Sequence, residues 1–85
     1  MGKCYLRTSD ISQVRHYTKG HTDYLEVKKT DGDILLLSVY HRDYTKAQMT
    51  ACEKLAELYA GIKDSMLKRT PFIELIITNG MICEQ

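Results

Sequence analysis

Residues 25–39, with the sequence LEVKKTDGDILLLSV, predict a β-hairpin. Two runs of strand-forming residues flank Thr30-Asp31-Gly32, a combination typical of a tight turn. A two-residue turn would place Ser38 on the same face as Leu25. A three-residue loop with Gly32 in the left-handed conformation gives an entirely apolar face instead, so we predict this second register. The residues of that face are Leu25, Val27, Leu35, Leu37 and Val39.

Residues 46–69 predict a long helix. Thr45 and Gln48 are spaced as a capping box, in which each side chain accepts a hydrogen bond from the backbone of the other residue. Lys68-Arg69 suits the negative end of the helix dipole, and Pro71 disfavours helical backbone at the residue before it. An apolar stripe at helical spacing should cover a sheet; it consists of Ala51, Cys52, Leu55, Leu58, Tyr59, Ile62 and Met66.

A second hairpin is predicted over residues 72–84, because Asn79-Gly80 is a strong signal for a type I′ turn. That turn would pair Ile77 with Ile82. The sequence therefore predicts one α+β domain over residues 1–85. We expect a small, mostly antiparallel sheet of about four to six strands built from hairpins, with the long helix on one face.

The N-terminal third gives a weaker signal. Residues 4–8 alternate as a strand with Cys4 and Leu6 pointing inward. Residues 11–18 carry helix start and stop signals but also many residues that favour strands, so the sequence leaves both alternatives open.

The composition is that of a folded globular protein, with 44% hydrophobic and 27% charged residues. No apolar run approaches the roughly 20 residues that cross a bilayer, and the first residues resemble neither a signal nor a transit peptide. Cys4, Cys52 and Cys83 are odd in number and widely spaced, which indicates reduced thiols rather than a disulfide framework. We therefore expect a cytoplasmic protein without a membrane partner.

No catalytic or metal-binding motif is evident. Zinc sites usually contain two ligands about two to four residues apart, and no Cys or His pair has that spacing. Asp31 and Asp33 could chelate a cation, but such residues are common at hairpin tips for turn formation. Cys52 lies on the apolar stripe, and no base can be identified for Cys4 or Cys83. We expect neither an enzyme nor a bound metal or cofactor.

Two surfaces contain more apolar residues than one helix on one sheet requires. The first is a helix shoulder beside the stripe, made of Met49, Ala56, Ala60 and Leu67. It either packs beneath the N-terminal segment or contacts a second molecule. The second is the sheet face turned away from the helix. Its partner-binding candidates are Tyr24, Ile34, Leu36, Tyr40 and Phe72, and the remaining predicted members are Glu26, Lys28, Ser38, Glu74 and Ile76.

Aromatic residues are enriched in interface cores, although exposed aromatics also serve cross-strand pairing. We therefore predict a small non-enzymatic module that acts by protein–protein interaction and forms a homodimer. Its size, its hairpins and its lack of catalytic motifs resemble, in general plan only, accessory or inhibitor proteins of phages and mobile elements.

The alternative is a nucleic-acid or nucleotide binder, in which tyrosines stack on bases and basic side chains contact phosphates. Its candidates are Tyr5, Arg7, Arg15, Tyr17, Lys19 and Lys28, supported by Tyr24 and Tyr40. Glu26 and Glu74 on the predicted face argue against it.

Overall fold

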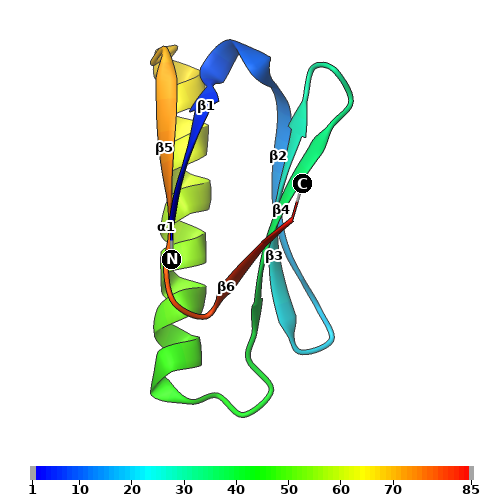
Figure 1. Ribbon diagram of the computed structural model, residues 1–85, viewed down its shortest axis with the longest axis vertical. Helices are drawn as coiled ribbons and strands as arrows, with labels where there is room; N and C mark the ends of the chain where they lie inside the picture. Colours follow the sequence, from blue (N-terminus) through cyan, green and yellow to red (C-terminus); the bar gives the residue numbers. More distant parts are fainter. Residues whose placement is uncertain (1, 85) are drawn as a thin grey trace.

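The computed structural model describes residues 2–84 and confirms the α+β class. One helix, α1 (Lys46–Lys68), packs against two antiparallel sheets with six strands in total (Figure 1). The smaller sheet pairs two strands, β1 and β5, and the larger one has the order β2-β3-β4-β6. The strands and the short 3-10 helix η1 are β1 (Gly2–Arg7), η1 (Thr8–Asp10), β2 (Ile11–Lys19), β3 (Thr22–Lys29), β4 (Ile34–Tyr40), β5 (Phe72–Ile77) and β6 (Met81–Glu84).

The β3–β4 hairpin has the predicted register. Leu25 lies opposite Leu37, and Gly32 has the left-handed backbone that the three-residue loop requires, with φ of 95°. The amide of Gly32 donates to the carbonyl of Lys29 at 3.1 Å, and the amide of Lys29 donates to the carbonyl of Asp33 at 2.8 Å. All five predicted inner residues are buried, so the apolar pattern did select the register.

The predicted second hairpin is wrong. β5 pairs with β1, and β6 pairs with β4, so that Ile82 lies opposite Ser38 instead of Ile77. A type I′ turn needs positive φ at both central residues, but only Gly80 of the Asn79-Gly80 pair has it. The turn still closes with a hydrogen bond from Met81 to Thr78, and it directs the chain from the smaller sheet to the larger one (Figure 1).

The ambiguous segment of residues 11–18 forms a strand, since β2 covers it entirely. A register shift interrupts β2 between Ile11 and Gln13, and beyond it Val14 lies opposite Val27 in the core. β1 confirms the predicted N-terminal strand: Leu6 is buried, and Cys4 packs against the core.

Helix α1 begins with the predicted capping box. The Thr45 hydroxyl accepts from the Gln48 amide at 3.2 Å, and the Gln48 side chain accepts from the Thr45 amide at 3.3 Å. The helix ends one residue earlier than predicted, because Arg69 adopts the left-handed conformation of a C-cap. Of the predicted stripe, Ala51, Leu55 and Ile62 are buried, and the other four residues are partly buried against the core. No helix in residues 2–84 combines the length and hydrophobicity needed to cross a membrane.

Candidate functional site

The outer face of the larger sheet is the surface turned away from α1. In Figure 1, α1 and the smaller sheet both lie on the opposite side of β2, β3 and β4, so no other part of residues 2–84 covers this face. Side chains alternate between the two faces of a strand. Leu25, Val27, Leu35 and Leu37 are buried on the inner face, so their neighbours along β3 and β4 lie on the outer face. Its residues are Gln13, Arg15, Tyr17, Lys19, Thr22, Tyr24, Glu26, Lys28, Ile34, Leu36, Ser38, Tyr40, Ile82 and Glu84.

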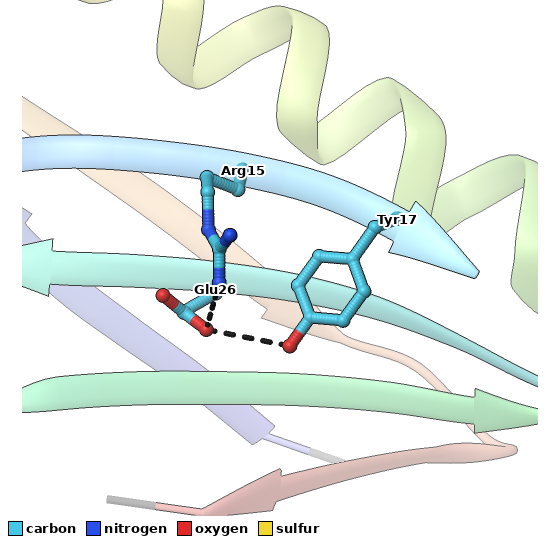
Figure 2. A network of polar contacts seen from close by, with 3 residues as sticks. All are labelled: Arg15, Tyr17 and Glu26. Atoms are coloured by element: carbon cyan, nitrogen blue, oxygen red, sulfur yellow. Dashed lines mark hydrogen bonds and ion pairs between the residues drawn. The ribbon is translucent and has the colours of Figure 1, made fainter. Parts of the chain in front are cut away.

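A polar and aromatic network crosses β2 and β3 on the outer face (Figure 2). The Arg15 guanidinium forms an ion pair with Glu26 at 3.0 Å, and the Tyr17 hydroxyl donates to the same carboxylate oxygen at 3.3 Å. Arg15 also lies over the Tyr17 ring, 5.0 Å from its centroid. The Tyr17 ring stacks on Tyr24, with 5.2 Å between centroids and 25° between planes. These contacts hold both tyrosines in place before any partner binds.

The ionisation states in this network follow from the contacts. The hydrogen bond from Arg15 lowers the pKa of Glu26, against a smaller opposing effect of burial, and the Arg15 charge lowers it further. Burial and the Glu26 charge raise the pKa of Tyr17. At neutral pH, Glu26 is therefore a carboxylate and Tyr17 a neutral hydroxyl that can donate to it.

Replacing Glu26 with glutamine should reduce the acid sensitivity of the fold. Because the pKa of folded Glu26 lies below its ordinary value of 4.5, the stabilisation is complete above that value and is lost as the pH falls through the folded pKa. Urea midpoints measured between about pH 6 and pH 2 should therefore fall less steeply in Glu26→Gln than in the wild type. The effect should be small, because the partner Arg15 is largely exposed.

Glu53→Gln is the matched control for that measurement, because it removes the same charge from an exposed position on α1. Its urea midpoint should fall with pH as steeply as that of the wild type. If the urea midpoints of Glu26→Gln and the wild type fall equally steeply toward acid pH, the ion pair does not stabilise the fold.

Four of the five partner-binding candidates lie together on the outer face: Tyr24, Ile34, Leu36 and Tyr40. Phe72 does not join them. It lies on β5 in the smaller sheet, opposite Arg7, whose guanidinium is 5.7 Å from the ring centroid. The error follows from the wrong second hairpin, which also misplaced Glu74 and Ile76. The wrong hairpin also placed Ile82 on the inner face, whereas it lies exposed on the outer face because β6 pairs with β4.

The nucleic-acid candidates are divided between the two sheets. Arg15, Tyr17, Lys19 and Lys28 lie on the outer face, whereas Tyr5 and Arg7 lie on β1. The positive charge of Arg15 is also compensated by Glu26 within the network.

The helix shoulder is exposed in the described part of the chain. Met49 is 52% and Leu67 84% accessible, and Ala56 and Ala60 are exposed. The N-terminal segment does not cover it, because β1 pairs with β5 and β2 forms an edge of the larger sheet. The shoulder thus stays a second candidate surface, with smaller side chains at its centre than the outer face has.

Sequence reasoning also missed a polar cluster on the inner side of the larger sheet, the Asp–His–Cys cluster of Asp23, His41 and Cys52. His41 is buried, and the other two residues are partly buried. One side-chain donor atom of each residue lies within 4.8 Å of the other two, and Nε2 of His41 is 3.0 Å from Oδ1 of Asp23. The three residues are distant in sequence, so no spacing motif indicates them. A usable signal was the strand alternation, which places Asp23 and His41 at inward positions next to the apolar residues Leu25 and Val39.

The cluster holds a protonated thiol beside a carboxylate. Burial, followed by the hydrogen bond to Asp23 and its charge, raises the pKa of Cys52 to about 11. Burial alone would raise the pKa of Asp23, but hydrogen bonds from Thr18, Cys52 and His41 outweigh it and lower the pKa. Because Cys52 faces a carboxylate rather than a free base, the cluster does not provide an activated thiolate nucleophile.

Comparison with known proteins identifies no relative: no protein-family model, curated protein or solved structure matches the chain. The fold and its surfaces therefore define only a general class: a small α+β protein in which the helix covers one face of the larger sheet.

Proposed function

We propose that the protein is a non-enzymatic binding module that forms a homodimer through the outer face of its larger sheet. The observation that carries this proposal is the set of large, exposed side chains on that uncovered face. Ile34 is 45%, Tyr40 49% and Ile82 57% accessible. Tyr40 lies diagonally opposite Tyr24 of the Tyr17–Tyr24 stack, Ile82 lies across Ser38 in the same row as Tyr24, and Ile34 lies further along β4 on the same face. Exposed apolar surfaces of this kind commonly mark contacts with other proteins.

The composition of the outer face also suits a protein partner. Tyrosine and arginine are enriched among residues that dominate interface energies, and lysine and glutamate are more frequent at the rim. Tyr17 and Tyr24 are already stacked, and Arg15 is already fixed by Glu26, so these side chains would lose little freedom on binding.

The arrangement of charges in one row of the outer face allows an ion pair between two copies. Arg15, Glu26, Leu36 and Glu84 form one row across the four strands, with the basic residue on β2 and an acidic residue on β6. A two-fold axis parallel to the strands would place two such faces together with β2 of one copy over β6 of the other. Arg15 would then approach Glu84 of the second copy, and the middle strands would bury Tyr24 and Leu36 between the sheets.

Substituting Leu36 with glutamate should dissociate this dimer. The new carboxylate would lie in the centre of the interface and between Glu26 and Glu84, its neighbours in the row. Sedimentation at about 100 μM should show a dimer for the wild type and a monomer of 9.8 kDa for Leu36→Glu. Circular dichroism should show that both proteins are folded.

Ala60→Glu is the matched control, because it places the same charge on the helix shoulder. It should leave the dimer intact. Dissociation by Ala60→Glu but not by Leu36→Glu would assign the interface to the shoulder, and a monomeric wild type would contradict the dimer itself.

The nucleic-acid alternative has less support. Only part of its candidate set shares one face, and Glu26 and Glu84 add negative charge to that face. Phosphate contacts would make binding strongly dependent on salt, whereas the dimer proposed here should change little between low and moderate salt.

A further inference from the structure

We propose that Asp23, His41 and Cys52 bind a divalent transition metal ion, with Zn²⁺ as the best match. A carboxylate oxygen, an imidazole nitrogen and a thiol sulfur are the three donor types that zinc accepts in proteins. Mg²⁺ and Ca²⁺ prefer oxygen ligands throughout, so a site with sulfur and nitrogen donors disfavours them.

The distances in the Asp–His–Cys cluster suit such an ion. Metal–ligand bonds of about 2.0 to 2.3 Å in a tetrahedral site separate the donors by about 3.3 to 3.8 Å. The three donor atoms here lie within 4.8 Å of one another, with 3.0 Å between Nε2 of His41 and Oδ1 of Asp23. Small side-chain movements would therefore create the coordination geometry without any change of backbone.

Three separate elements hold the donors. Asp23 belongs to β3, and Cys52 lies in the early part of α1, whose start is fixed by the capping box. His41 directly follows β4, is only 7% accessible, and is anchored by its amide, which donates to the carbonyl of His21 at 2.8 Å. A site supported by a strand, a strand end and a helix is already ordered before the metal binds.

The surroundings provide the remaining parts of a metal site. The Thr18 hydroxyl donates to Oδ1 of Asp23 at 2.7 Å and orients the carboxylate, as groups outside the coordination sphere commonly do. A pocket of about 470 Å³ opens onto the cluster, so water or an added ligand can take a fourth position. Its lining residues are Thr18, Asp23, His41, Tyr44, Met49, Cys52 and Glu53. Three protein ligands with an open fourth position are an established coordination pattern for zinc in proteins.

The binding step releases one proton. The thiol of Cys52 loses its proton as sulfur bonds to the metal, and that proton passes to solvent. His41 coordinates through the lone pair of Nε2 as a neutral ring, with its own proton on Nδ1. In the metal-free cluster the proton on Nε2 is hydrogen-bonded to Asp23, so it moves to Nδ1 on binding and the metal replaces that hydrogen bond. Nδ1 is buried and has no hydrogen-bond partner among the described residues.

The test is a titration of the full chain with Co²⁺, whose spectrum reports on its ligands. One equivalent should produce visible absorption of a tetrahedral ion and a near-ultraviolet band of thiolate–cobalt charge transfer, and Zn²⁺ should abolish both. Cys52→Ser should remove the charge-transfer band and weaken Zn²⁺ binding by at least about tenfold. At equal concentration, Zn²⁺ should raise the melting temperature of the wild type more than that of Cys52→Ser.

Cys83→Ser is the matched control, because Cys83 is an exposed thiol outside the cluster; it should keep the bands, the affinity and the Zn²⁺-dependent stabilisation. His41→Gln provides a second variant that keeps a polar side chain at the site, and it should lose the affinity even if Cys52→Ser folds poorly. Absence of the charge-transfer band in the wild type, or equal Zn²⁺ affinity in the wild type, Cys52→Ser and His41→Gln, would overturn the proposal. The cluster lies on the inner side of the sheet, so these results do not depend on the dimer.

Discussion

Replacing Leu55 with alanine should lower the free energy of unfolding by about 2 to 5 kcal/mol. Leu55 is fully buried at the centre of the α1 stripe, between Ala51 and Ile62, which are buried with it. The substitution removes apolar contacts and leaves a cavity that the strands around it can fill only in part. Urea denaturation of the two proteins, compared at equal m-values, measures the difference.

Leu67→Ala is the matched control on the same helix. Leu67 is 84% accessible, so its truncation should change the free energy of unfolding by no more than about 0.5 kcal/mol. A loss below that value for Leu55→Ala would mean that α1 presents a different face to the sheets.

The second large effect is expected at Gly80. Its φ of 93° is strained for any residue with a side chain, and an added Cβ would lie 3.2 Å from Cβ of Ala51. Gly80→Ala should therefore lose about 1 to 3 kcal/mol from the backbone alone, and more from the contact with α1. Thermal and urea denaturation should both show the loss.

Gly32→Ala separates those two contributions. Gly32 has a similar φ of 95°, but an added Cβ there meets no atom within 4 Å. It should lose only the backbone part, so Gly80→Ala should be the less stable of the two variants. Equal losses would contradict close packing of the β5–β6 turn against Ala51.

The sequence predicted those parts of the fold that depend on neighbouring residues. The capping box, the helix stripe and the β3–β4 register all follow from patterns within one element or one short turn. In the β3–β4 hairpin, the turn residues allowed two loop lengths, the apolar face selected one of the two registers, and the structure has that register.

The C-terminal pairing could not be predicted in this way. Asn79-Gly80 is a strong local signal, but strand pairing is decided by which distant edge is available. β1 offers β5 a six-residue partner that buries Leu6 and Ile73 together, and β4 offers β6 an open edge. The displacement of Phe72 from the outer face follows from that choice.

The candidate surfaces were predicted to different extents. Alternation within β3 and β4 was sufficient for Tyr24, Ile34, Leu36 and Tyr40, because each strand fixes its own two faces. The Asp–His–Cys cluster is formed by tertiary contacts between β3, the end of β4 and α1, and no interval along the chain marks it.

The pairing of β1 with β5 also affects the order in which the chain can fold during synthesis. The β2, β3 and β4 hairpins connect neighbouring segments and can form once residue 40 has left the ribosome. β1 is made before these strands, but Gly2 lies opposite Ile77, so its partner β5 is made only after α1. Until then the apolar side of β1 and the free edge of β4 stay exposed on the nascent chain. β1 can therefore pair only after α1 and β5 have been synthesised.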